Sequence, residues 1–218
     1  MEKKIKKSSK ERIQKILIAF NWKMNPGKMA DAIELLKKIS SSPNFKNISK
    51  KRDVVFFPPI PFLHELKKSF KNINFGVQNI SEYEEGAHTG EFSAGQVTSL
   101  GAKYVIVGHS ERRASKDSSG ESNEQVAKKL KLAHKYKLQP IVCVGENSRE
   151  GKGDYHSFVG TQLLASLSSL SKNEVASTII AYEPVWALST TVGKKESHPS
   201  DSLEMAIYIR KVLSDKYG

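Results

Sequence analysis

The chain has 218 residues, of which 38% are hydrophobic and 27% are charged, proportions that are ordinary for a folded globular domain. It contains no apolar run near the roughly 20 residues that a membrane-spanning helix needs, so we expect no membrane association. The single cysteine, Cys143, cannot form an internal disulfide, so the sequence favours a reducing cytoplasm. The net charge of +12 is compatible with nucleic-acid binding, with solubility alone or with attraction of an anionic substrate.

The first 14 residues are polar and basic, and we predict that residues 1–14 form a disordered tail. They lack the apolar stretch of a secretory signal. The other lysines are scattered along the chain, without the interleaved aromatic residues that single-stranded nucleic acids stack on. We therefore expect no nucleic-acid partner. The alternative is a basic nucleic-acid-binding protein, which would be favoured by nucleic-acid binding that survives deletion of residues 1–12.

From residue 15 onwards, short apolar runs alternate with segments of helical periodicity. Continuous runs of this kind are typical of strands that are buried on both faces of a parallel sheet. They predict strands at residues 16–20, 54–57, 73–77, 104–107, 140–144 and 177–182. The intervening segments predict helices over about 29–36, 62–70, 94–100, from 122 onwards, 162–170 and 201–216.

Six strand–helix units in succession predict an α/β fold with a parallel sheet and helical crossovers. The pattern alone does not distinguish an open doubly wound sheet from a barrel. No GxGxxG motif follows the first strand, which argues against a dinucleotide-binding fold. No GxxxxGK[ST] phosphate loop is present either.

Chemically useful side chains follow three of the predicted strands. Asn21 and Lys23 follow the first strand, His109 the fourth and Glu183 the sixth. In parallel α/β folds these strand ends meet at one functional edge. Alone, each residue has an ordinary explanation: a solvated loop lysine, a core or capping histidine, or a helix-capping glutamate before Pro184. Together, a cation, an imidazole and a carboxylate make an anion-stabilising acid–base site.

Five stretches resemble the signature motifs of the triosephosphate isomerase family, in that family's order and at close to its spacing. The resemblance extends from about residue 15 to residue 218 and implies a TIM (β/α)8 barrel, here with only six β/α units and the last two missing. The stretches are Asn21–Asn25 (NWKMN), Gly86–Glu91 (GAHTGE), Val107–Arg113 (VGHSERR), Val142–Glu146 (VCVGE) and Ala181–Ala187 (AYEPVWA).

The resemblance implies interconversion of dihydroxyacetone phosphate and D-glyceraldehyde 3-phosphate, a step of glycolysis and gluconeogenesis, by proton transfer through an enediolate. Glu183 would be the base and His109 a neutral electrophile, roles for which this family is itself the standard example. Lys23, with Asn21 beside it, would bind the substrate and stabilise its negative charge. No metal and no organic cofactor are implied.

Other roles follow from the same motifs. Glu111 would position the catalytic lysine, and Ser110 would support the site. The segment at 187–195 corresponds to the family's lid, in which Ser189 and Gly193 would contact the substrate phosphate. Thr89 would lie at the interface of a homodimer, next to Asn21 of the partner subunit.

The family's barrel has eight units and about 250 residues, whereas six units can be identified here. The glycine-rich turns that follow strands seven and eight and bind phosphate in the family are not among the motifs. A polypeptide of these 218 residues alone is therefore expected to be weakly active or inactive, and to have open sheet edges. We expect a fragment of a longer chain; the alternative is a truncated remnant that only binds phosphate ligands or a partner chain.

Overall fold

The computed structural model describes residues 16–114, 120–149, 155–188, 191 and 193–218. The predicted tail over residues 1–14 lies outside them. Within the described residues, six strands form one parallel sheet in which each strand pairs with the next one in the chain. All six lie within two residues of the predicted bounds: β1 (Leu17–Asn21), β2 (Asp53–Phe57), β3 (Asn74–Val77), β4 (Tyr104–Val107), β5 (Gln139–Val144) and β6 (Ile179–Tyr182).

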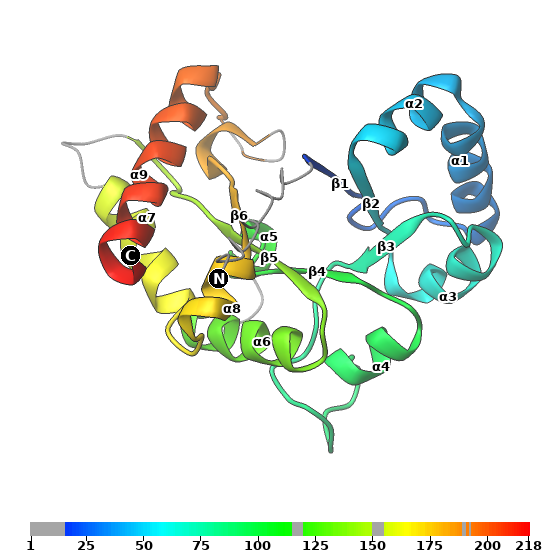
Figure 1. The fold of residues 1–218 in the computed structure, drawn as a ribbon, viewed down its shortest axis with the longest axis horizontal. Coiled ribbons are helices and arrows are strands. Elements are labelled where there is room, and N and C mark those ends of the chain that lie inside the picture. The colour runs from blue at the N-terminus through cyan, green and yellow to red at the C-terminus, as the bar shows by residue number, and fades with distance from the viewer. Residues whose placement is uncertain (1–15, 115–119, 150–154, 189–190, 192) are drawn as a thin grey trace, which may run out of the picture.

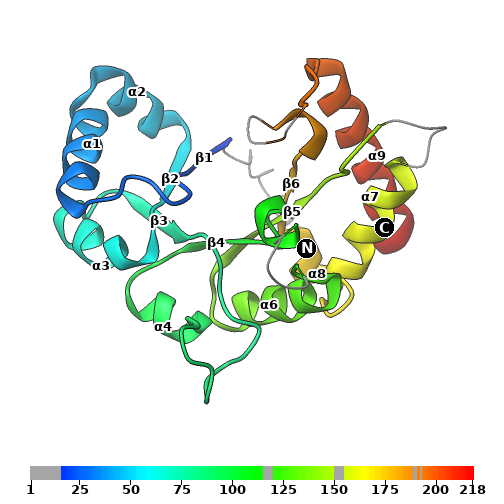
Figure 2. The ribbon, with the colours of Figure 1, turned by 180° about the vertical axis from the view of Figure 1, so that it is seen from behind.

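The sheet is curved into a half-barrel, with its helices on the outer side (Figures 1 and 2). The strand order runs from β1 to β6 without a reversal, so the doubly wound alternative is wrong, since that fold reverses its strand order at a switch point. In the described part of the chain, β1 pairs only with β2, and β6 only with β5. The half-barrel therefore has two open edges.

Short helices account for most differences from the sequence predictions. Four of the described helices, each of nine residues or fewer, have no counterpart among the sequence predictions, because so few turns carry too little periodicity. The helix predicted over 162–170 instead spans Tyr155–Ser166, so it both begins and ends earlier than predicted. No described helix has both the length and the apolarity to cross a membrane. The helices are α1 (Met29–Ser41), α2 (Pro43–Lys51), α3 (Ile60–Ser69), α4 (Ala94–Ser99), α5 (Ser110–Arg113), α6 (Asn123–Lys135), α7 (Tyr155–Ser166), α8 (Lys172–Ser177), the 3-10 helix η1 (Val185–Ala187) and α9 (Pro199–Tyr217).

Helix α6 begins with a capping box. The Gln125 backbone N–H donates to Ser122 Oγ over 3.2 Å, and the Ser122 N–H donates to Gln125 Oε1 over 2.9 Å. These two bonds satisfy backbone N–H groups that have no partner inside the helix. They fix the point at which the chain enters α6, just after the segment that carries His109.

Side chains of the sheet alternate between two apolar layers. On β2, Val54 and Phe56 face the outer helices, whereas Val55 and Phe57 face the barrel interior. Cys143 belongs to the inner layer and is buried. Burial, and then the charge of Glu183, raise the pKa of the Cys143 thiol. Cys143 is therefore a core thiol.

Candidate active site

The predicted functional residues lie at the carboxyl edge of the half-barrel. Asn21 is the last residue of β1, and Lys23 follows it by two positions. A cavity of about 310 Å³ is lined by Asn21, Lys23, His109 and Glu111. Glu183 does not line this cavity, but its carboxylate contacts His109 at the cavity's margin. The structure thus brings together residues that are 162 positions apart in the sequence.

Lys23 is held by both its side chain and its backbone. Its Nζ lies 2.6 Å from Oε1 of Glu111, the contact that the resemblance implied. Its φ of +52° is uncommon and strained for a residue with a side chain. The Lys23 N–H donates to Asn21 Oδ1 over 2.9 Å, and its carbonyl accepts from Gln78 Nε2 over 2.7 Å. Gln78 also donates to Phe57 O, so it fixes the lysine segment to β2.

His109 is buried, and its two ring nitrogens have different neighbours. Nδ1 accepts a hydrogen bond from the backbone N–H of Glu111 over 3.2 Å. A neutral ring that accepts at Nδ1 carries its proton on Nε2. Nε2 lies 3.3 Å from Oε1 of Glu183. The fold therefore presents His109 as a hydrogen-bond donor on the side that faces the carboxylate.

Glu183 follows β6 directly and has a side chain that is only 19% exposed. Its Oε2 accepts the backbone N–H of Ser110 over 3.1 Å, so the contact is to the main chain of the supporting serine. The Ser110 hydroxyl is buried and makes no hydrogen bond to another described residue. Glu183 does not cap the helix that follows it, because the N-cap of η1 is Pro184.

Arg113 is a component of the site that the sequence analysis did not identify. Its guanidinium donates to Gly108 O and to Asn123 Oδ1 over 2.7 Å each, and to Cys143 O over 3.3 Å. These bonds join the ends of β4 and β5 to the start of α6. Desolvation lowers the pKa of Arg113, and the charge of Glu121 opposes this. The only signal in the sequence was its place in the VGHSERR stretch.

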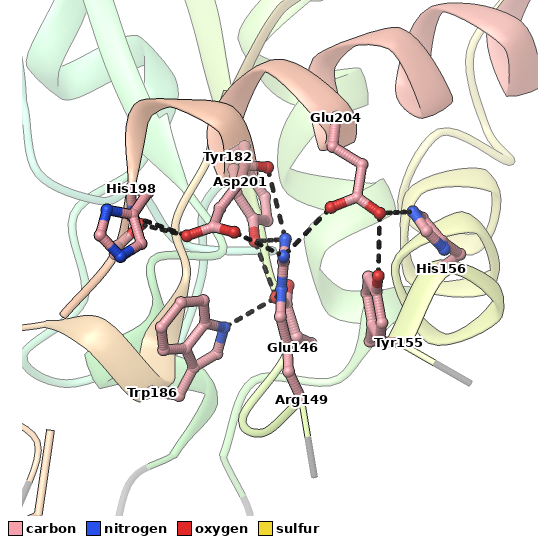
Figure 3. Close-up of polar contacts among 10 residues, drawn as sticks. Glu146, Arg149, Tyr155, His156, Tyr182, Trp186, His198, Asp201 and Glu204 are labelled. Atoms are coloured by element: carbon pink, nitrogen blue, oxygen red, sulfur yellow. Dashed lines mark hydrogen bonds and ion pairs between the residues drawn. The ribbon is translucent and has the colours of Figure 1, made fainter. Parts of the chain in front are cut away.

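A second cluster anchors the start of the segment that the resemblance identifies as a lid (Figure 3). Three donors converge on one oxygen, Oε1 of Glu146: the Trp186 indole at 2.8 Å, the Tyr182 hydroxyl at 2.7 Å and Arg149 Nε at 2.9 Å. Burial, and then the hydrogen bond to Glu146, raise the pKa of Tyr182 well above its usual value. Arg149 also lies 3.2 Å from Glu204 on α9, so the cluster connects β5, β6 and the last helix.

Of the remaining predicted residues, one is not described and two do not line the cavity. Ser189 lies outside the described residues. Gly193 is exposed, with a φ of +69°, and no described atom lies within 4 Å of a Cβ built on it. Thr89 is exposed in the loop after β3, although its neighbours Gly90 and Glu91 line the cavity. Within the described residues, no three His, Cys, Asp or Glu side chains are grouped as a metal ion would require.

Comparisons with known proteins agree with this geometry. Residues 16–218 match the family model described as triosephosphate isomerase. The chain is 40% identical over 203 residues to the triosephosphate isomerase of Herminiimonas arsenicoxydans, covering 92% of this chain and 77% of the relative. It is 38% identical over 207 residues to that of Lawsonia intracellularis, covering 94% and 79%. It is 37% identical over 208 residues to that of Saccharopolyspora erythraea, covering 93% and 76%.

Proposed function

Because this chain belongs to the triosephosphate isomerase family, we propose that its carboxyl-edge site interconverts dihydroxyacetone phosphate and D-glyceraldehyde 3-phosphate. The observation that carries the proposal is the 3.3 Å contact between His109 Nε2 and Glu183 Oε1 at the margin of the cavity that Lys23 lines. A half-buried carboxylate, an imidazole donor and a lysine cation are the groups that proton transfer next to a carbonyl requires.

In the proposed reaction, Glu183 is the base. It removes a proton from C1 of dihydroxyacetone phosphate, and the electrons of the broken C–H bond form the C1–C2 double bond of an enediolate. The C2 oxygen gains negative charge and accepts a hydrogen bond from His109 Nε2. Glu183 then returns the proton to C2, and the transfer of a hydroxyl proton from O1 to O2 completes the aldehyde.

Lys23 stabilises the negative charge that develops on the substrate. Loss of one preorganised donor of this kind costs about 3–4 kcal/mol of activation free energy. Glu111 holds the ammonium group, and the hydrogen bond to Asn21 holds the lysine backbone. Catalysis therefore depends on residues that do not themselves react, because they fix the position of the charge.

The proposal also includes a lid. The cluster around Glu146 fixes Trp186, so movement of the following segment would begin close to that residue. We propose that Ser189 and Gly193 contact the substrate phosphate when the segment covers the cavity. Closure would exclude water from the enediolate and protect it from loss of phosphate.

A second candidate is a non-catalytic chain that binds phosphate ligands or a partner. The two open edges of the described sheet favour this candidate. On β1, Phe20 is 44% exposed although it stacks against Phe56, and unpaired strand edges promote association with other chains. Concentration-dependent assembly in sedimentation velocity, without Glu183-dependent turnover, would favour this candidate over the isomerase.

The expected quaternary structure is a homodimer of the complete barrel, in which Thr89 contacts Asn21 of the partner subunit. The expected location is the cytoplasm, because the chain has a single cysteine and that cysteine is buried. The dimer is tested with Thr89→Arg, which should shift the sedimentation coefficient toward that of a monomer. An unchanged coefficient would contradict this interface.

The isomerase proposal is tested by measuring triose phosphate interconversion in a coupled assay. Glu183→Gln should abolish turnover because the amide cannot accept the proton. Glu85→Gln is the matched control, since Glu85 is an exposed glutamate in the loop after β3.

A further inference from the structure

We propose that a groove at the amino edge of the sheet binds a nucleoside di- or triphosphate. The groove lies between α2 and the turn that joins α3 to β3, and its cavity has a volume of about 460 Å³. It borders the starts of β2 and β3, so it is at the opposite end of the strands from the cavity that Lys23 and His109 line. The proposal is independent of the isomerase activity.

The groove lies in a basic part of the described chain. Residues 28–74 contain 10 lysines and arginines against 4 aspartates and glutamates. Three of these cations line the groove from different places: Lys46 from α2, Arg52 from the residue after α2, and Lys71 from the turn after α3. A single surface lysine is ordinary, but three cations around one hollow form a site for several phosphate charges.

The groove cations are not neutralised by nearby carboxylates. Lys46, Arg52 and Lys71 make no ion pair with any described carboxylate. Asp53 follows Arg52 directly, but the alternation of side chains along β2 places it on the interior face of the strand. Burial is the main cause that raises the pKa of Tyr104, and the charge of Asp53 raises it further. The cations are therefore available to a ligand.

Two further acids of the same stretch, Glu34 and Glu65, are already engaged. Glu34 pairs with Lys38 at 2.6 Å. Glu65 accepts the hydroxyl of Ser69 over 3.3 Å, and Ser69 is itself a residue of the groove wall. Glu65 is thus the carboxylate that a bound phosphate must avoid. The opposite side of the groove, where Lys46 and Arg52 lie, is the side on which we place the phosphates.

The groove has an apolar floor as well as a basic rim. Phe45 and Phe70 are half-buried and line it together with the buried Val54 and Ile73. Phe45 is fixed by its ring contact with Phe56, at 6.1 Å between centroids. Aromatic walls favour a flat ring system, and the volume is within the usual range for small-molecule pockets. A nucleotide whose base packs on this floor and whose phosphates lie at the basic rim satisfies both features.

The test is isothermal titration of the full chain with ATP, with tripolyphosphate and with adenosine. ATP should bind more tightly than either part alone. Lys46→Gln and Arg52→Gln should each weaken ATP binding about tenfold or more, because each removes a charged hydrogen bond to phosphate. Phe70→Leu should weaken ATP binding but leave tripolyphosphate binding unchanged, with circular dichroism confirming that the variant is folded.

The matched control is Lys50→Gln. Lys50 lies on the same helix α2 but does not line the groove, so this variant should bind ATP like the parent. Deletion of residues 1–12 should also leave binding unchanged. Equal losses in Lys50→Gln and Lys46→Gln, or equal affinities for ATP and tripolyphosphate, would overturn the proposal in favour of unspecific charge. Tighter binding of an RNA oligonucleotide, weakened equally by all the lysine variants, would overturn it in favour of a polynucleotide surface.

Discussion

The backbone N–H of Glu111 donates a hydrogen bond to Nδ1 of His109 over 3.2 Å, while the side chain of the same glutamate contacts Lys23 at 2.6 Å. One residue thus orients both the imidazole and the cation. The geometry directs the proton of a neutral imidazole to Nε2, the nitrogen that faces Glu183. This arrangement is the basis for the roles that we propose for all three side chains.

The tautomer of His109 can be measured directly. In the neutral ring, nitrogen NMR shifts should show the proton on Nε2, because Nδ1 is occupied as an acceptor. Glu111→Gln should leave the tautomer unchanged, since it keeps the backbone N–H. A neutral ring protonated at Nδ1 would contradict the assignment of Nε2 as the donor to substrate.

Glu111→Gln should affect catalysis more than stability. The Lys23 and Glu111 side chains are 38% and 45% exposed, and exposed pairs contribute about 1 kcal/mol or less to stability. Loss of the carboxylate should nevertheless displace the lysine and lower kcat/KM about tenfold. The control is Glu34→Gln, which breaks the Lys38–Glu34 pair on α1, also at 2.6 Å. Equal effects of the two variants on activity would contradict a positioning role for Glu111.

Glu183→Asp should retain the charge but shorten the reach of the base. A displacement of about 1 Å at a reacting group costs about 100-fold in rate, so kcat should fall by that order in a polypeptide with the complete barrel. Thermal unfolding should show that the variant is folded. A change of less than threefold in kcat would argue against Glu183 as the proton acceptor.

The capping box of α8 should make stability depend on pH. Glu174 accepts hydrogen bonds from Ser171 and contacts Lys131, and these interactions lower its pKa from 4.5 to about 2. A lowered native pKa adds stability above the unfolded pKa, and this stability is lost as the pH falls toward the native pKa. Urea unfolding should therefore show Glu174→Gln to be less stable than the parent at pH 7. The difference should shrink below about pH 4.5 and vanish near pH 2. A difference that is constant with pH would contradict this.

The strands and the main site residues were predictable because each depends on a local pattern. Buried parallel strands are continuous apolar runs, and the residues that follow them meet at one edge. Lys23, His109 and Glu183 could therefore be placed together before any geometry was known. Periodicity does not show which strands pair, so the sequential strand order was predictable only from the resemblance to a barrel family.

Gln78 and Arg113 were not predictable, because their roles come from neighbours that are distant in the sequence. Gln78 donates to the carbonyls of Lys23 and Phe57, 55 and 21 positions away. Arg113 reaches Cys143, 30 positions away. A glutamine or an arginine in isolation is most often solvated, and only the packed strands show that these two are internal donors.

The proposed proton transfer is tested most directly by isotope exchange, which reports abstraction even where turnover is slow. The chain is incubated with dihydroxyacetone phosphate in D2O, and loss of the C1 proton is followed by proton NMR. We predict exchange above the uncatalysed rate in the parent chain, and exchange at the uncatalysed rate in Glu183→Gln. Equal rates in the parent and in Glu183→Gln would contradict the assignment of Glu183 as the catalytic base.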